Sequence, residues 1–349
     1  GHDTVVIGAG PAGAAAAVTL ARAGRHVLLV AARRPDRTSG VGEGAPPGLD
    51  RAVDDVFGAG TFVAGDHLRS LGNRVAWGSD DLQRTDFMFS PFGTGWHLDR
   101  PAFDARLVVA AESAGVTVRT ATDALGPDVA GRVVIDASGR RAVHARRHAA
   151  RRVVRDRLAA ALATYRMLPE DDDATTTVEA TEGGWWYSCP VPAGRRVVGF
   201  LTDGDLLPGD VRRPGGFDRL ARRTRHVGTL LGSGLPSPPA VVAAGTAYLD
   251  PPCGIGWLAT GDAAASFDPL SSQGILTAVL MGREAARRVD DPVRFASIYR
   301  EIIARYDAER SATYQRERRW SASPFWARRA GREGTDPTPA ARSPRSSPQ

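Results

Sequence analysis

Two short segments of this 349-residue chain carry residue types and spacings that could hold a phosphorylated cofactor. The first is TVVIGAGPAG at residues 4–13, an apolar strand followed by a glycine-rich turn. In such a turn Gly8 permits the tight bend, Gly10 lets the backbone approach a pyrophosphate, and Gly13 allows close packing of helix on strand. The following helix points its N-terminus at the phosphates. The segment therefore predicts a dinucleotide site.

The second segment is GDAAASFDPLSSQGI at residues 261–275, in which a Gly-Asp pair follows an apolar strand and the chain then enters a helix. A Gly-x-Gly-x-x-Gly turn alone is a weak signal, but the two segments together predict a chain that binds one FAD from both ends. The unpaired N–H groups at the start of this helix, near Gln273 and Gly274, suit negative charge on a flavin ring. Pro269 lies in the part of the segment expected at the flavin face.

Three side chains are candidates for the chemistry. Asp268 could act as a base if a poorly solvated pocket raises its pKa. A loop carboxylate held by backbone N–H groups is an equally weighted alternative. Trp185 and Tyr187 belong to a predicted strand in which alternation sends them to one face and Trp186 to the other. An aromatic wall suits a flat aromatic substrate, so we expect Trp185 and Tyr187 to line its cavity.

The elements that must position these residues predict an α/β chain with an antiparallel insertion. Residues 4–9, 11–23 and 26–31 form a right-handed strand–helix–strand unit. Further strands are expected at 116–120, 132–136, 159–168, 174–181, 184–191, 195–203, 240–249 and 256–262, and helices at 48–57, 101–114, 216–231, 272–288 and 292–318. The rest of residues 32–95 is expected to be irregular.

This order of elements predicts two domains and two smaller segments. They are a discontinuous FAD-binding domain (1–55, 96–155 and 245–290), a substrate domain (56–95 and 156–244), a C-terminal helical segment (291–330) and a disordered tail (331–349).

Composition excludes several other classes. All 45 basic residues are arginines, so a mechanism that needs a catalytic lysine is excluded. No membrane helix and no secretory leader are recognisable, and we expect a cytoplasmic protein whose two cysteines, Cys189 and Cys253, form no disulfide. The arginines are not interleaved with aromatic residues, so no nucleic-acid partner is expected despite the formal charge of +6. His144 and His148 share helical spacing without a third ligand, and no metal is expected.

With these motifs in place, the chain resembles the flavin-dependent monooxygenases of the class that also contains flavin-dependent halogenases. The resemblance implies a Rossmann-type FAD-binding domain like that of glutathione reductase and the aromatic hydroxylases, with an inserted antiparallel-sheet substrate domain and C-terminal helices. It also implies cofactor contacts at Gly42 and Glu43 in GVGEGAPP (40–47), at Arg100 in WHLDRPAFDARL (96–107), at Asp136 and Gly139 after a buried strand, and at Asp262 beside the ribityl chain.

A narrower resemblance is to the flavoprotein maturases of cysteine tryptophylquinone enzymes. It rests on GGWWYSCPVP at 183–192, on residues 261–275 and on RERRWSASPFWARR at 316–329. It implies that reduced FAD forms a hydroperoxide with O2 and that the oxidised group is a tryptophan in a partner polypeptide. The reductant would be NAD(P)H acting directly or a separate flavin reductase. Halogenation is disfavoured, because halogenases need a lysine that this chain lacks.

Three points stay open at this stage. The second strand ends at Val30-Ala31-Ala32 without the acid that binds the adenosine ribose, and Asp36 comes five residues late. Trp320, Phe325 and Trp326 could pack the last helix onto the flavin domain or present a docking surface. The substrate could be a polypeptide or a small aromatic molecule, or the chain could be an escort that binds flavin without turnover.

Overall fold

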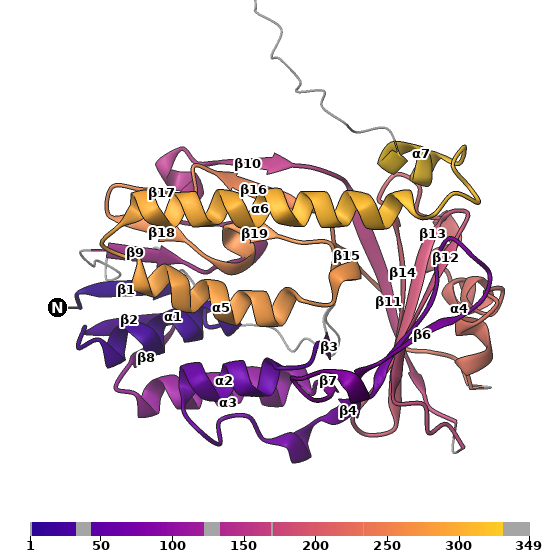
Figure 1. Ribbon diagram of the computed structural model, residues 1–349, viewed down its shortest axis with the longest axis horizontal. Helices are drawn as coiled ribbons and strands as arrows, with labels where there is room; N and C mark the ends of the chain where they lie inside the picture. Colours follow the sequence, from indigo (N-terminus) through magenta and orange to yellow (C-terminus); the bar gives the residue numbers. More distant parts are fainter. Residues whose placement is uncertain (1, 33–42, 122–132, 169, 233, 331–349) are drawn as a thin grey trace, which may run out of the picture.

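The computed structural model describes residues 2–32, 43–121, 133–168, 170–232 and 234–330. Figure 1 shows two sheets beside each other, a parallel sheet on the left of the view and a steeper sheet on the right. The long helix α6 (Pro292–Gln315) lies across both. The expected α/β architecture with an antiparallel sheet and C-terminal helices is confirmed.

The parallel sheet has the strand order β17-β18-β9-β1-β2-β8, in which the β17–β18 pair is antiparallel. Its strands are β1 (Thr4–Ile7), β2 (Val27–Ala32), β8 (Thr117–Ala121), β9 (Val133–Asp136), β17 (Cys253–Gly254) and β18 (Trp257–Ala259). All four residues of β1 are buried, because a central parallel strand is covered on both faces. The helix α1 (Pro11–Arg22) connects β1 to β2.

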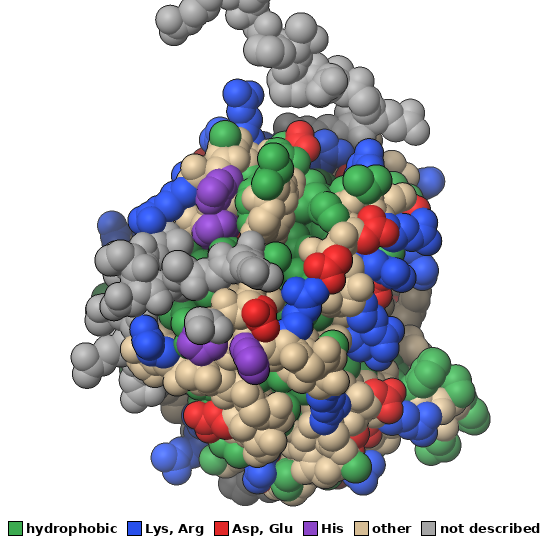
Figure 2. Space-filling view, turned by 90° about the vertical axis from the view of Figure 1, so that its left-hand side faces the viewer, with side chains coloured by type: hydrophobic (Ala, Val, Ile, Leu, Met, Phe, Trp, Pro, Cys, Tyr) green, Lys and Arg blue, Asp and Glu red, His purple; other side chains and the backbone are tan. Residues whose placement is uncertain are grey.

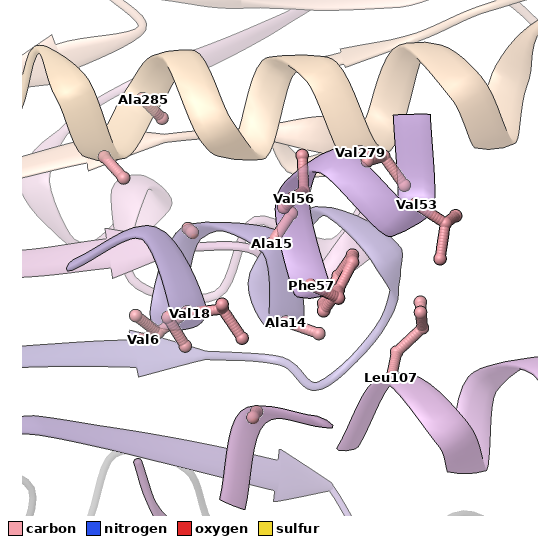
Figure 3. Close-up of a cluster of buried hydrophobic side chains, with 14 of the residues drawn as sticks. Val6, Ala14, Ala15, Val18, Val53, Val56, Phe57, Leu107, Val279 and Ala285 are labelled. Carbon is pink, nitrogen blue, oxygen red and sulfur yellow. The ribbon is translucent and has the colours of Figure 1, made fainter. Parts of the chain in front are cut away.

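The core beside this sheet consists mainly of alanine and valine side chains (Figure 3). Helix α1 meets α2 (Leu49–Phe57), α3 (Arg100–Ser113) and α5 (Gly274–Arg287). The side chains that pack together include Ala14, Ala15, Val18, Val53, Val56, Phe57, Leu107, Val279 and Ala285. A Cβ atom at Gly282 would lie 2.1 Å from the carbonyl oxygen of Ala12, so α1 and α5 cross at backbone contact. This crossing places the middle of α5 against the first turn of α1.

The second sheet has seven strands in the order β15-β11-β14-β13-β12-β5-β6, antiparallel except for the β12–β5 pair. They are β5 (Gly72–Ala76), β6 (Gln83–Asp86), β11 (Leu158–Arg166), β12 (Thr175–Thr181), β13 (Gly184–Val191), β14 (Arg195–Asp203) and β15 (Ala240–Ala243). Side chains of α4 (Gly216–Ala221) pack on one face, and those of α6 and α7 (Pro324–Ala330) pack on the other.

Two expectations about strands need correction. The segment 32–95 contains short strands, since β3 (Gly44–Ala45), β4 (Leu68–Ser70) and β7 (Gly95–His97) form a small sheet. The strand expected at 240–249 breaks, because after β15 the chain enters a third sheet of β10 (Arg151–Val154), β16 (Ala247–Asp250) and β19 (Ala265–Ser266). Strands β5 and β6 of the seven-stranded sheet also lie in this segment. Strand β6 escaped prediction because it is exposed, has no apolar alternation and is held by its ladder to β5.

The helix expected at 216–231 ends at Ala221 for a tertiary reason. The buried carboxylate of Glu179 on β12 accepts hydrogen bonds from the backbone N–H groups of Arg225, His226 and Val227. A charged acceptor that binds three consecutive N–H groups outcompetes the helical bonds those groups would otherwise make.

The aromatic residues after α6 pack inside the molecule. Phe325 and Trp326 on α7 are buried, and the Trp326 indole N–H donates to the carbonyl oxygen of Thr181 at 2.9 Å. The packing alternative therefore holds for these two residues, but they lie against the seven-stranded sheet rather than the parallel one. Buried Asp203 on β14 anchors α7 through Arg329, with an N–O distance of 2.7 Å, and through Arg328 at 2.8 Å.

This anchor predicts acid sensitivity of α7. Burial alone would raise the pKa of Asp203, but its hydrogen bonds and ion pairs with Arg329 and Arg328 outweigh that effect and lower it. An acid whose folded pKa lies below its unfolded value stabilises the fold above the unfolded pKa, near 3.9, and loses that contribution as the pH falls through the folded value. We expect Asp203→Asn to be less stable than the wild type at pH 7 and to lose less of its stability on acidification, as followed by tryptophan fluorescence. Asp205→Asn, an exposed second partner of Arg328, serves as the control, and equal shifts in both variants would contradict the anchor.

On the face of the molecule at the left of Figure 1, arginine and acidic side chains are interspersed (Figure 2). Among the described residues, no helix combines the length and the apolar character needed to cross a bilayer.

Candidate functional site

The β1–α1 turn has the backbone that a pyrophosphate site requires. Gly8 has a φ of +109°, and a Cβ atom there would lie 2.2 Å from the carbonyl oxygen of Ala137. A Cβ atom at Gly13 would lie 1.8 Å from the carbonyl oxygen of Gly8. Gly10 is the N-cap residue of α1, and no side chain caps this helix within the described chain. The N–H groups of the first turn are therefore open to an anion.

The loop after β9 lies next to this turn. The Asp136 carboxylate is buried and accepts four hydrogen bonds from its own loop, two from Ser138 and one each from the backbone N–H groups of His144 and Ala145. Its side chain thus shapes the loop beside the β1–α1 turn, and a direct cofactor contact at Asp136 stays a prediction. Gly139 has a φ of +70°, and nothing described lies within 4 Å of its Cβ position.

The second segment meets the first at Gly261. A Cβ atom at Gly261 would lie 2.6 Å from the Cβ atom of Ala12 in the first turn of α1. Asp262 follows, exposed, with a carboxylate oxygen 3.7 Å from Nε of Arg140. The two motifs are therefore adjacent in space, as their pairing in the sequence predicted.

The start of α5 is open. Gln273 is its N-cap residue and makes no side-chain cap, and nothing described lies within 4 Å of the Cβ position of Gly274. The preceding Ser272 has a φ of +51°, which turns the chain from residues 269–271 into the helix. An uncapped N-terminus of a 14-residue helix favours a neighbouring negative charge.

A pocket lies between this segment, β3 and the seven-stranded sheet. Its accessible volume is about 50 Å³, and it is lined by Glu43, Gly44, Thr176, Val178, Trp185, Tyr187, Cys189, Pro269, Leu270 and Ser272. Four predicted site residues thus meet here: Glu43, Trp185, Tyr187 and Pro269. Trp186 lies on the opposite face and stacks on Phe200, with ring centroids 4.7 Å apart, as alternation predicted.

Tyr187 contributes an unused polar group to the pocket. Its hydroxyl oxygen is buried and has no hydrogen-bond partner among the described residues. Burial first, and then the nearby carboxylate of Glu43, raise the pKa of Tyr187 well above its ordinary value. A neutral phenol that lacks a partner can donate to or accept from a ligand.

Asp268 is buried behind the pocket and is not among its lining residues. Its carboxylate accepts from the Leu270 backbone N–H at 3.0 Å and from the Tyr314 hydroxyl at 2.7 Å, and it lies 3.5 Å from Nε of Arg310. Burial raises the pKa of Asp268 despite the opposing charge of Arg310. The expected rise of its pKa is present, and its carboxylate is engaged by one backbone N–H, a tyrosine hydroxyl and an arginine. Its role as a base stays a prediction.

The remaining predicted residues lie elsewhere. Arg100 begins α3 and pairs with Asp104 at 3.3 Å, away from the pocket lining. Gly42 and the late acid Asp36 lie outside the described residues. In the described part of the chain, no three His, Cys, Asp or Glu side chains come together as a metal site.

Sequence reasoning missed three residues around the pocket. Tyr314 bridges Asp268 and Trp185, because its hydroxyl also accepts from the Trp185 indole N–H at 3.1 Å. The i,i+4 spacing of Arg310 and Tyr314 on a predicted helix could have indicated a shared face. His97 was not singled out; it is buried, and its Nε2 lies 3.1 Å from the Thr176 hydroxyl. Burial, helped by the charge of Arg196, lowers the pKa of His97 to about 4, so it is neutral at pH 7.

Solved structures share this architecture. The chain superposes on the myxobacterial chondrochloren halogenase CndH with a TM-score of 0.78 and 20% identity, covering 94% of this chain and 85% of that one. It superposes on QhpG, described as a peptidyl tryptophan dihydroxylase essential for tryptophylquinone cofactor biogenesis, with a TM-score of 0.75 and 24% identity, covering 94% and 78%.

The chain has the fold of the flavin-dependent halogenases and hydroxylases. Its sequence is 27% identical to LodB of Marinomonas mediterranea, described as an FAD-dependent oxidoreductase, over 94% of this chain and 96% of that protein. It is 28% identical to the digeranylgeranylglycerophospholipid reductase of Methanoculleus marisnigri over 88% and 81%. The profile of the family described as glucose inhibited division protein A matches residues 3–43. These similarities agree with the expected fold, enzyme class and cofactor, those of an FAD-dependent oxidoreductase.

Proposed function

We propose that this protein is an FAD-dependent monooxygenase that hydroxylates a tryptophan of a partner polypeptide during the biogenesis of a quinone cofactor. The observation that carries the proposal is the pocket, in which Trp185 and Tyr187 face the segment that precedes the open start of α5. The likeness to LodB over almost the full length of both chains, and to the fold of QhpG, supports the choice of substrate.

The residues present fit FAD. The open N-terminus of α1 at Gly10 would hold the pyrophosphate, Asp262 would contact the ribityl chain, and the first N–H groups of α5 would face the ring carbonyl side. Open space at the Cβ positions of Gly139 and Gly274 leaves room for the cofactor. When bound and reduced, FAD supplies the activation of dioxygen, with electrons from NAD(P)H or from a separate reductase.

The chain's own contribution would be to exclude water and to orient the ring to be oxidised. Trp185 is held in place by the hydrogen bond from its indole N–H to the Tyr314 hydroxyl. The Tyr187 hydroxyl offers a hydrogen bond to a substrate polar group, such as an indole N–H or a backbone carbonyl. Halogenation is not proposed, because the chain contains no lysine. The setting is the reducing cytoplasm, which suits the free thiols of Cys189 and Cys253.

An exposed apolar patch supports a macromolecular substrate. Met88, Phe89 and Phe92 are 81%, 84% and 57% exposed and lie on the connection between β6 and β7. The Cβ atom of Phe92 would lie 3.4 Å from a Cβ atom at Gly48, four residues after the pocket residue Gly44. Large apolar side chains gathered in the open are typical of protein–protein contacts.

The proposal is tested by mass spectrometry on the products of neighbouring genes co-expressed with and without this chain. Oxygen gained on a tryptophan in the presence of this chain is the expected result. Replacing Phe89 and Phe92 by serine should reduce that modification at least several-fold while leaving flavin content unchanged. If the chain holds flavin and consumes O2 without modifying any polypeptide, the substrate is a small molecule; if it holds flavin and consumes no O2, it is an escort.

A further inference from the structure

Five aromatic side chains form one connected row of rings. Four of the seven tryptophans, Trp77, Trp185, Trp320 and Trp326, lie in ring contact between the pocket and the outside of the C-terminal segment. Together with Tyr187 they make up what we call the aromatic chain. Tyrosine and tryptophan are the side chains from which an electron is most easily removed by one-electron oxidants.

The rings follow one another at short spacing. The centroids are 6.5 Å apart for Tyr187 and Trp185, 6.4 Å for Trp185 and Trp77, 5.2 Å for Trp77 and Trp326, and 6.4 Å for Trp326 and Trp320. A parallel route runs through Tyr314, which is hydrogen-bonded to Trp185 and lies 6.0 Å from Trp326. Both routes meet at Trp326.

The two ends of the aromatic chain differ in exposure. Trp185 and Tyr187 line the pocket, and Trp77, Trp185 and Trp326 are buried. Trp320 is half-buried at the outer end. The aromatic chain therefore connects the site where dioxygen would be activated to a position that water can reach.

The hydrogen bonds of the indoles also differ along the aromatic chain. The buried N–H groups of Trp77 and Trp326 donate to the carbonyl oxygens of Thr313 and Thr181, each at 2.9 Å. Carbonyl oxygens are poor proton acceptors, so these rings can pass an electron without giving up a proton. The guanidinium carbon of Arg319 lies 4.2 Å from the Trp320 ring centroid, which disfavours a cationic ring there and favours proton loss to water.

Trp186 shows what simple core packing looks like on the same strand. It stacks on Phe200 and contacts Phe217, with centroids 4.7 and 5.4 Å away. Phenylalanine is far harder to oxidise than tryptophan, so no comparable row leads outward from Trp186 through these rings.

We propose that the aromatic chain conducts oxidising equivalents from the pocket to the surface and so protects the pocket when dioxygen is activated without substrate. The inference rests on the proposed oxygen chemistry of this pocket. The oxidant is a one-electron oxidant of the oxygen-radical class, which takes an electron from Trp185 and is reduced. Trp77 or Tyr314 then donates an electron to the oxidised Trp185. Trp326 in turn reduces that ring, and Trp320 reduces Trp326, so that the oxidised ring is finally Trp320. Trp320 then releases its indole proton to water, and a soluble thiol restores it by donating a hydrogen atom.

The test uses an oxidant that needs no flavin. A ruthenium polypyridine complex is attached to Ser272→Cys at the pocket in a background of Cys189→Ala and Cys253→Ser, since both native cysteines are free thiols and Cys189 also lines the pocket. Flash illumination with an electron acceptor creates the oxidant in place, and peptide mass spectrometry locates oxidised tryptophan. We expect oxidation mainly at Trp320, and a several-fold shift of it back to Trp185 in Trp326→Phe. Trp186→Phe is the matched control and should behave as the wild type.

Two further measurements keep the result interpretable. Bulk hydrogen peroxide should oxidise Trp320 equally with and without Trp326→Phe, since exposure alone then decides. If Trp326→Phe loses its fold, Trp320→Phe interrupts the same row at its end and should move oxidation to Trp326 and Trp185. Oxidation of Trp320 by the tethered oxidant that is independent of Trp326 would overturn the proposal. Failure of the proposed function shows separately, as a lack of O2 consumption by the FAD-loaded protein.

Discussion

Replacing Gly13 by alanine is expected to abolish flavin binding and to destabilise the fold severely. The new Cβ atom would lie 1.8 Å from the carbonyl oxygen of Gly8, so strand and helix must separate. Overpacking usually costs about 1–3 kcal/mol, and we expect the upper end or more because the obstructing atom is backbone. The measurements are the thermal midpoint and the flavin retained after purification.

Gly274→Ala is the matched control for this variant. Nothing described lies within 4 Å of its Cβ position, and alanine is a better helix former than glycine by up to about 1 kcal/mol. The fold should therefore be as stable as the wild type, while the affinity for FAD falls because the methyl group occupies the proposed cofactor space. A wild-type melting temperature in Gly13→Ala would contradict the packing argument. Unchanged FAD affinity in Gly274→Ala would mean that no flavin approaches the start of α5.

Replacing Arg310 by leucine is expected to have the second large effect, a loss of about 3–5 kcal/mol in the free energy of unfolding at pH 7. Arg310 lies between two largely buried carboxylates, at 2.8 Å from Asp156 and 3.5 Å from Asp268. Without the guanidinium both negative charges lack their cationic partner, and they also repel each other. Urea unfolding as a function of pH measures the effect.

The pH dependence of Arg310→Leu follows from the direction of the Asp268 shift. Burial already raises the pKa of Asp268, and removal of the Arg310 charge that opposes this shift raises it further. An acid whose folded pKa exceeds its unfolded value favours the fold below the unfolded pKa and loses that contribution as the pH rises through the folded value. The variant should therefore be least impaired near pH 4 and most impaired at neutral pH.

Two variants control this experiment. Arg305→Leu removes an exposed arginine from the same helix and should change little. Among the described residues, Arg305 pairs with Glu309, one turn further along α6. Adding Asp268→Asn to Arg310→Leu should recover part of the loss, since it removes one unpaired charge. A pH-independent loss without recovery would contradict the electrostatic account. In the single variant Asp268→Asn, product formation lost at an unchanged melting temperature would instead identify Asp268 as the base.

Local patterns in the sequence were enough to predict the βαβ start, the four long strands of the second sheet and the helices α3, α5 and α6. Each of these has a strong apolar period or capping signal within its own residues. The glycine pattern likewise determined the β1–α1 turn, because only glycine tolerates the backbone approaches at positions 8 and 13. The opposite facing of Trp185 and Trp186 followed from strand alternation alone.

Only the tertiary structure decided which of these residues meet. The pocket joins Glu43, Tyr187 and Pro269 from three distant parts of the chain, and a pairing of this kind leaves no periodic signal. Asp136 and Asp268 read as site residues in the sequence, but hydrogen bonds with their own loops and with α6 engage them, because a buried carboxylate must be satisfied wherever donors are closest. Sequence thus determined the elements and the cofactor turn through local physics, while long-range packing assigned each polar side chain its partner.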